Sequence, residues 1–298
     1  MRWLFHVRHV GTAAGDRYAP ESLAREGFIH ASYVKDVVES ARLYFPADAR
    51  LEVLQIDPRR LDVPVDVAQT PRGAMPHLHG PVPTDAIRAT VPLEDFEAKG
   101  FGDEVTGTRF GFIAFDGMTL LDLVGVYDPL SRIASMGFDA TSTCEVVAGH
   151  EGQVWARDGV ELKVQRVRPP LTDFDVVVVP GGPGSRTLVR EASFIDWLAA
   201  FPVNRLIASV CTGALLLGGA GRLRGKRATT HANALGDLAA YGATAVAERV
   251  VDEGQLVTAG GVTSGLDLGI HLVRRLHGDE VAAKVERQME WGDGRSAR

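Results

Sequence analysis

The chain has 298 residues, which suits two domains of about 150 residues better than one. Its net charge of −6 provides no general attraction for nucleic acid or for an anionic membrane surface. Hydrophobic residues at 45% and charged residues at 23% are typical of a folded soluble protein and exclude a disordered one.

Proline and glycine are unevenly distributed along the chain. Residues 1–97 hold nine of the 15 prolines but five of the 33 glycines, and the remainder reverses that ratio. Residues 98–107 are polar, contain several glycines and show no regular spacing of apolar residues, as expected of a linker. We therefore predict a first domain at 1–97, a linker at 98–107 and a second domain at 108–292.

The first domain shows short strands around one helix. Residues 3–7 and 51–56 have strand character, and the second stretch stops at Asp57-Pro58. Between them, apolar residues stand at i, i+3, i+4 and i+7 from Val34 to Ala41, the stripe of an amphipathic helix. This pattern predicts a small α+β domain.

The second domain alternates strands and helices. We predict strands at 109–115, 176–179 and 206–210, and helices at 120–131 and 193–200. The strands are β-branched runs without polar alternation, which indicates a parallel sheet covered on both faces. The sequence therefore predicts an α/β doubly wound parallel sheet with a ligand crevice at the carboxyl ends of its strands.

Cys211 lies where an apolar strand runs directly into a small-residue helix. This is the arrangement of a nucleophile elbow, in which the reactive residue occupies a strained turn at the strand end. The positive end of the following helix is expected to lower the pKa of the thiol and favour the thiolate. The alternative is a buried structural cysteine, since free cysteine is among the most buried residue types.

Three further features surround this elbow in the sequence. The glycine-rich loop 179–185 can bring backbone N–H groups close to a reacting oxygen, although many glycine turns follow strands. Asp122, flanked by leucines in a predicted helix, needs a partner if it is buried, or it stabilises the helix dipole. His231 could approach the thiol, or it is a hydrogen-bonded scaffold residue.

Five motifs in this order resemble the ThiJ/PfpI superfamily of class I glutamine amidotransferase-like domains. They are Leu-Asp-Leu around Asp122, Pro-Gly-Gly-Pro-Gly at 180–184, Cys-Thr-Gly-Ala at 211–214, Ala-Thr-Thr-His at 228–231 and the glycine-rich stretch 257–265. The second domain is most similar to the isonitrile hydratase branch and to the sensor domains of some AraC-type regulators. The resemblance implies a flavodoxin-like fold.

The resemblance also implies roles for individual residues. Cys211 would be the nucleophile, Asp122 its acidic partner, and the backbone amides of Gly182 and Thr212 the oxyanion donors. Gly181 and His231 are candidate supporting residues. Thr212 replaces the histidine of protease-like members, which argues against peptidase activity, and Ala232 replaces a common aromatic residue, which predicts a different substrate pocket.

Three functions follow from this resemblance. The first is an isonitrile hydratase-like lyase, in which Cys211 and Asp122 convert a small isonitrile to an N-substituted formamide. The second is a hydrolase or deglycase acting on a small carbonyl adduct. The third is a non-catalytic module in which Cys211 captures a ligand or senses oxidation.

Histidine is concentrated in the first domain, which holds five of the nine. The segments Gly-Phe-Ile-His-x-Ser at 27–32 and Pro-His-x-x-Gly-Pro at 76–81 resemble the bacterial domain of unknown function 952. That family is similar to the ADP-ribosyltransferase fold, which implies a small-ligand or nucleotide pocket. Its lining residues would be His6, Tyr18, His30, Ser32 and His77. Zinc is an alternative ligand of these imidazoles, but their spacing fits no standard site, so we expect no metal and no cofactor.

The remaining expectations concern location and partners. Arg2, His6 and Arg8 interrupt the apolar stretch that a signal peptide needs, and the uncharged run 206–221 is too short for a membrane span. Two cysteines, Cys144 and Cys211, are expected to remain thiols. We expect a cytoplasmic protein that binds a small molecule, neither nucleic acid nor membrane, and that forms a homodimer as this superfamily usually does.

Overall fold

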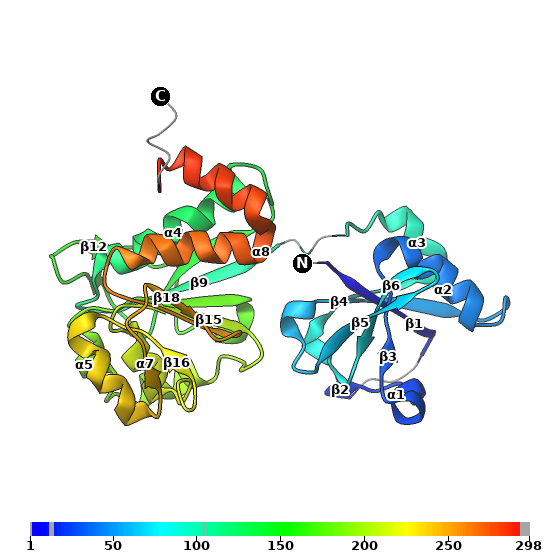
Figure 1. Ribbon diagram of the computed structural model, residues 1–298, viewed down its shortest axis with the longest axis horizontal. Helices are drawn as coiled ribbons and strands as arrows, with labels where there is room; N and C mark the ends of the chain where they lie inside the picture. The colour runs from blue at the N-terminus through cyan, green and yellow to red at the C-terminus, as the bar shows by residue number, and fades with distance from the viewer. Residues whose placement is uncertain (1, 12–14, 104, 106, 293–298) are drawn as a thin grey trace. The chain divides into compact units, whose positions relative to one another are not determined.

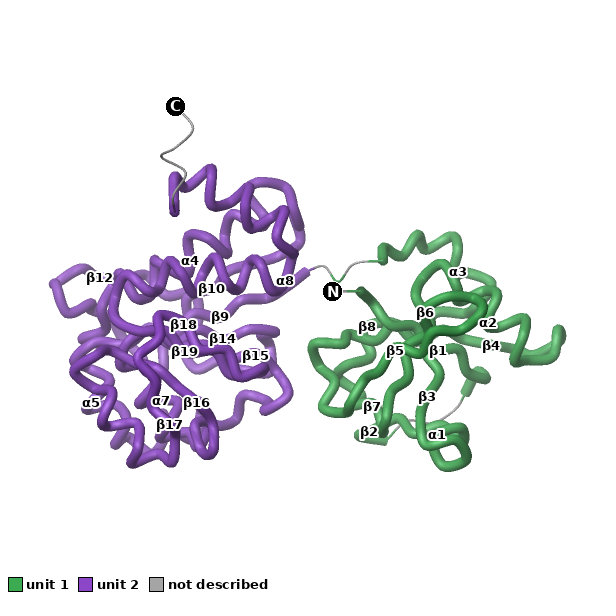
Figure 2. Tube along the Cα trace, viewed as in Figure 1, with its two compact units in different colours: residues 1–105 green, residues 106–298 purple. Residues whose placement is uncertain are grey.

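The chain folds into two compact units, residues 1–105 and 106–298 (Figure 2). The computed structural model describes residues 2–11, 15–103, 105 and 107–292. Residues 104 and 106 of the predicted linker lie outside the described residues. Each unit has its own hydrophobic core.

Unit 1 is built on antiparallel sheets. Its first sheet has the order β1-β4-β8 and its second β3-β6-β5, while β2 pairs with β7. The strands are β1 (Leu4–His9), β2 (Arg17–Tyr18), β3 (Ile29–His30), β4 (Leu51–Ile56), β5 (Val65–Thr70), β6 (Gly73–Leu78), β7 (Val82–Pro83) and β8 (Ile87–Pro92). The helices and 3-10 turns are α1 (Glu21–Glu26), η1 (Val34–Asp36), α2 (Val37–Tyr44), η2 (Pro58–Arg60), η3 (Thr84–Ala86) and α3 (Leu93–Lys99).

The first sheet of unit 1 is buried on both faces. Phe5 and Val53 pack in one cluster with Val37 of α2 and Phe96 of α3. The alternate residues of the same strands, such as Leu54, pack in a second cluster with residues of the other sheet. The predicted α+β character is therefore observed, with helices on one face of this sheet (Figure 1).

Two boundaries in unit 1 differ from the sequence expectation. The apolar stripe begins in the 3-10 turn η1 and continues into α2, because a spacing of three residues fits both helix types. The predicted linker also starts too early, since α3 extends to Lys99 and the Phe101 ring stacks on Phe96 with centroids 5.2 Å apart. Val105 is 8% exposed in the same cluster.

Unit 2 contains a seven-stranded sheet with the order β13-β10-β9-β14-β15-β19-β18. All neighbours are parallel except β18 and β19. The strands of this sheet are β9 (Arg109–Ala114), β10 (Thr143–Ala148), β13 (Arg166–Val167), β14 (Val176–Val179), β15 (Leu206–Val210), β18 (Val250–Asp252) and β19 (Leu256–Ala259). Two short pairs lie outside it, β11 (Val154–Trp155) with β12 (Glu161–Leu162) and β16 (Arg227–Ala228) with β17 (Thr244–Ala245).

Helices cover both faces of this sheet, so the predicted doubly wound α/β fold is confirmed (Figure 1). The helices α4 and α8 pack on each other along one face, while α5 and α7 lie on the other. The helices are α4 (Leu120–Ser135), α5 (Ser185–Leu188), α6 (Ala192–Ala199), α7 (Gly213–Gly219) and α8 (Ser264–Gln288, interrupted at Gly278). The 3-10 segments are η4 (Leu171–Asp173) and η5 (Ala232–Tyr241).

This arrangement places three chain turns at one edge of the sheet. The turns after β9, β14 and β15 all leave from carboxyl ends of adjacent parallel strands. Three of the five sequence motifs, at Asp122, 180–184 and 211–214, lie in or directly after these turns. The motif at 228–231 begins in β16, and the stretch 257–265 begins in β19. Within the described ranges, no helix combines the length and apolar character needed to cross a bilayer.

Candidate active site

Cys211 occupies the turn between β15 and α7. Its φ of 56° is in the left-handed region, which is uncommon for a residue other than glycine and marks local backbone strain. Its backbone N–H donates to the carbonyl oxygens of Ala259 (3.0 Å) and Gly260 (2.9 Å), and its own carbonyl accepts from the Thr230 hydroxyl at 2.7 Å. The strained turn is therefore held from both sides by its neighbours.

Asp122 lies in the first turn of α4 and is fully buried. Its Oδ2 accepts the backbone N–H of Gly181 at 3.0 Å, whereas Oδ1 has no hydrogen-bond partner in the described part of the chain. Burial raises the pKa of the carboxyl to about 6, against the opposing effects of the Gly181 amide and the Cys211 thiol. This carboxyl can therefore gain or lose a proton near neutral pH.

The Cys211 thiol is held in its neutral form. Burial and the neighbouring Asp122 charge raise its pKa to about 11, and the backbone amides of Thr212 and Val262 offset only part of this increase. The expectation that the elbow lowers the thiol pKa is therefore wrong, because desolvation outweighs the two amides. Each of the two groups shifts the other's pKa, which requires them to lie close together, so they form a coupled pair.

The glycine-rich loop after β14 packs directly against the elbow. A side chain on Gly181 would put a Cβ 2.4 Å from the Thr212 backbone nitrogen, so only glycine permits this approach. The N–H of Gly182 donates to Thr212 Oγ1 at 2.9 Å. The resemblance implies that the Gly182 amide is an oxyanion donor. In the structure, this amide is already hydrogen-bonded to the Thr212 hydroxyl.

His231 is the residue before η5, where its Nδ1 accepts the backbone N–H of Asn233 at 3.2 Å. A Cβ on Gly261 would meet the imidazole at 2.8 Å, so the ring packs against the loop that carries Val262. Its hydrogen bond is to its own helix turn and not to the thiol. Of the two interpretations of His231, this arrangement favours a hydrogen-bonded residue of the scaffold over a residue that acts on the thiol.

Two known protein families match parts of this chain. Residues 109–275 match the DJ-1/PfpI family. The chain belongs to the DJ-1/PfpI family. Residues 9–90 match a second family, a domain of unknown function numbered 952, as the motifs of the first domain predict.

Individual relatives carry different functions. The DJ-1/PfpI unit is 35% identical over 184 residues to an isonitrile hydratase from Pseudomonas putida, covering 61% of this chain and 78% of that enzyme. It is 29% identical to the HTH-type transcriptional regulator GbdR from Pseudomonas aeruginosa over 59% of this chain, but spans only 48% of the regulator. The family therefore includes both an enzyme and a regulator among the proteins similar to this chain.

Solved structures show the same fold. A ThiJ/PfpI family protein from Pseudomonas syringae superposes with a TM-score of 0.57 at 28% identity, covering 63% of this chain and 76% of that one. Schizosaccharomyces pombe DJ-1 superposes with a TM-score of 0.55 at 20% identity, covering 62% of this chain and all of that one.

Two residues beside the candidate site were missed by the sequence interpretation. The Ser185 hydroxyl, fully buried, lies 2.8 Å from the Gly182 carbonyl and 2.9 Å from Thr212 Oγ1, so it links the glycine loop to the elbow. Val262, with a φ of 33°, points its amide toward the thiol. Ser185 directly follows the glycine-rich motif 180–184, and Val262 lies within the stretch 257–265. These positions are the sequence signal from which their roles could have been predicted.

The structure places the five residues of the expected pocket in unit 1 in a buried group and a partly exposed group that contact each other. His6 and Tyr18 are buried and hydrogen-bonded to each other (Nε2 to OH, 2.9 Å), and desolvation lowers the pKa of His6 to about 4. Ser32 bonds to the Ser40 hydroxyl in the interior. His30 and His77 form a partly exposed ring contact, with centroids 5.4 Å apart, and the His30 carbonyl oxygen lies 2.6 Å from His6 Nδ1. No group of three or more potential metal ligands is present in the described ranges.

Proposed function

We propose that the DJ-1/PfpI unit is a cysteine-dependent enzyme that adds water to a small isonitrile, R–N≡C, to give an N-substituted formamide. The observation that carries this proposal is the buried pair of a neutral Cys211 thiol and an Asp122 carboxyl with a pKa of about 6. Such a pair can move a proton without holding two negative charges side by side. The 35% identity to an isonitrile hydratase supports the choice of substrate.

In the first step, Cys211 Sγ bonds to the terminal carbon of the isonitrile while Asp122 Oδ1 accepts the thiol proton. The carboxyl then returns this proton to the same carbon. The product is the thioimidate R–N=CH–S–Cys211, which is bound covalently to the protein. Oδ1 is suited to this transfer because it has no other partner in the described residues. The nucleophile is thus generated only when a substrate is present, and the resting thiol stays protonated.

In the second step, water adds across the C=N bond of the thioimidate. Its hydroxyl bonds to the carbon and its proton to the nitrogen, which gives R–NH–CH(OH)–S–Cys211. The C–S bond then breaks, the hydroxyl proton passes through Asp122 to the sulfur, and R–NH–CHO is released. One water is consumed and the thiol is restored, so atoms and electrons balance. No electron acceptor or bound metal is required by this sequence.

The direct test is formamide production from cyclohexyl isonitrile, followed by mass spectrometry. We expect turnover by the full chain and by a Cys144→Ala control, since Cys144 lies in β10 with its own pKa raised to about 12 by burial. We expect no turnover by Cys211→Ala. Unchanged turnover in that variant would refute the proposal.

A second candidate is a non-catalytic module, favoured by the similarity to the regulators. In this case Cys211 captures a ligand or senses oxidation. Mild peroxide treatment followed by peptide mass spectrometry distinguishes the two, because a sensor requires Cys211 to oxidise faster than Cys144. A parallel assay with methylglyoxal tests the hydrolase or deglycase alternative.

A further inference from the structure

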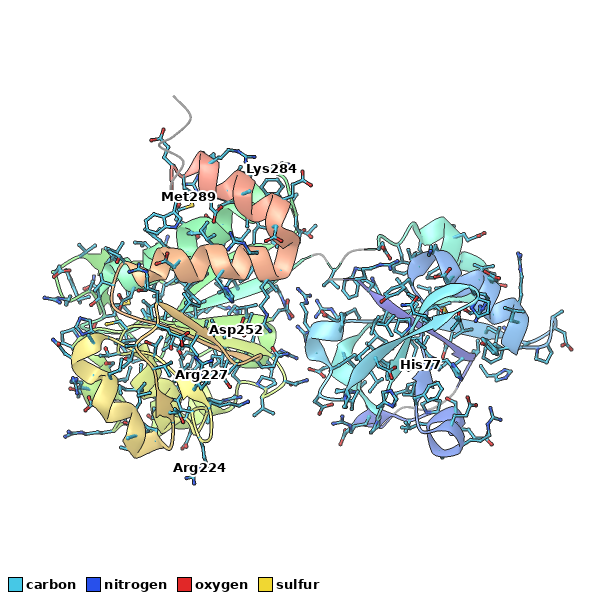
Figure 3. The ribbon with its side chains drawn as sticks, viewed as in Figure 1. His77, Arg224, Arg227, Asp252, Lys284 and Met289 are labelled. Atoms are coloured by element: carbon cyan, nitrogen blue, oxygen red, sulfur yellow. The ribbon has the colours of Figure 1, made fainter. Side chains whose placement is uncertain are left out.

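Five aromatic and imidazole rings on unit 1 form a continuous series of contacts. Phe28 stacks on His77 with centroids 4.0 Å apart and lies 5.9 Å from His79. His30 contacts His77 on one side, at 5.4 Å, and stacks with Tyr44 on the other, at 5.6 Å. We call these residues the ring cluster; His77, on β6, is labelled in Figure 3.

The ring cluster is not part of the hydrophobic core of unit 1. Tyr44 is 58% exposed, and the side chains of His30 and His79 are each 37% exposed. The rings come from the end of α2, from β3 with the residue before it, and from β6 with the residue after it. These segments are far apart in sequence. Core packing therefore does not account for their convergence, and partly exposed aromatic surface of this kind is typical of binding sites.

Neighbouring carboxylates orient the imidazoles of the ring cluster. Glu26 Oε2 lies 2.7 Å from His30 Nε2, and Asp66 Oδ2 lies 3.1 Å from His79 Nε2. Glu26 also pairs with Arg25 through its other oxygen. The acidic groups beside the rings are thus engaged with imidazole or guanidinium partners, and they fix the ring edges in place.

Arg72 is the positive group at the Tyr44 end of the ring cluster. Its guanidinium donates to the Tyr44 hydroxyl at 3.1 Å and to Ser40 Oγ at 3.3 Å, and Ser40 is itself held by Ser32 at 2.9 Å. No carboxylate pairs with Arg72 in the described ranges. Two neutral hydroxyl partners orient the guanidinium without neutralising it, so its remaining donors are available to an anion.

We propose that the ring cluster and Arg72 bind a small planar aromatic anion. The ring of the ligand stacks on the exposed rings, and its carboxylate or phosphate group bonds to the Arg72 guanidinium. Burial and the nearby His30 lower the pKa of His77, so this imidazole is uncharged at neutral pH and Arg72 supplies the attraction. This site is independent of the chemistry proposed for Cys211.

The test is a calorimetric titration of the full chain with three probes of similar size. Benzoate is planar and anionic, benzamide is planar and neutral, and cyclohexanecarboxylate is anionic but not planar. We expect benzoate to bind about tenfold more tightly than either of the others, because each lacks one of the two recognised features. Resonances of ¹³C-labelled histidine side chains should shift for His30 and His77 with benzoate.

Variants locate the site. Arg72→Gln and Tyr44→Leu should each weaken benzoate binding by about tenfold. Arg42→Gln, which removes an exposed arginine two residues before Tyr44 on α2, should leave it unchanged. The proposal is overturned by no benzoate binding at about 20 mM, by equal binding of the three probes, or by binding that Arg72→Gln does not weaken.

Discussion

Asp122 carries an energetic cost that follows from its burial. Its folded-state pKa of about 6 lies above the ordinary value of 3.8, so ionisation opposes folding. The resulting loss of unfolding free energy is absent below the ordinary pKa of 3.8 and grows as pH rises towards the folded-state pKa of about 6. It is complete above about pH 7, where it reaches at most about 3 kcal/mol. A residue that lowers stability in this way fits a group retained for chemistry.

We therefore expect Asp122→Asn to be more stable than the native chain at about pH 8, by roughly 1–2 kcal/mol after the loss of carboxylate hydrogen bonding. At about pH 4.5 the difference should be much smaller, because most of the native carboxyl is then protonated. Urea unfolding of both proteins at the two pH values measures this. A difference that does not change with pH would show that Asp122 does not titrate as described.

At the scale of the elements, the close approach of the loop after β14 to the elbow is the feature on which the site depends. Gly181→Ala would place its Cβ 2.4 Å from a backbone atom that cannot move away easily. We expect it to lower the free energy of unfolding by about 2 kcal/mol or more and to abolish activity. Gly236→Ala, whose Cβ would meet nothing within 4 Å, is the matched control and should fold with full activity.

If Gly181→Ala unfolded at the same urea concentration as Gly236→Ala, the loop would not be packed against Thr212. Circular dichroism during urea titration is sufficient for this comparison. The same variants assayed for formamide separate a loss of fold from a loss of activity.

The sequence predicted three central strands of the unit 2 sheet and the helices α4 and α6, but gave no bounds for β10, β13, β18, β19 or α8. The β-branched run at 176–179 and the apolar run at 206–210 coincide with β14 and β15, because continuous apolar strands have few alternative structures. The direction of the Cys211 pKa shift was predicted wrongly. It depends on burial and on the approach of Asp122 from α4, which are tertiary features with no local signal.

The ring cluster of unit 1 also depends on tertiary contacts that have no local signal in the sequence. The motifs around His30 and His77 singled out two histidines that lie in the ring cluster, together with His6 and Tyr18, which are hydrogen-bonded to each other behind the His30 backbone. Alternate strand residues point to opposite faces, and only the pairing of β3 with β6 brings His30 opposite His77. Arg72 gave no signal because its partners Tyr44 and Ser40 are distant in sequence.

At the scale of the whole molecule, the two units have separate cores. We expect a fragment of residues 106–298 to fold and to retain the isonitrile activity, since Cys211, Asp122 and their hydrogen-bond partners all lie within it. We also expect the full chain to be a homodimer. Light scattering at about 10 µM measures the second expectation, and a monomeric mass would contradict it.

The most direct test of the proton pair is the pH dependence of kcat/KM for formamide formation. The native chain should gain activity as pH rises through about 6, because Asp122 must be ionised to accept the thiol proton. Asp122→Asn should lose activity by at least about a hundredfold and show no rise in this range. An Asp122→Asn enzyme with the native pH profile would contradict the account.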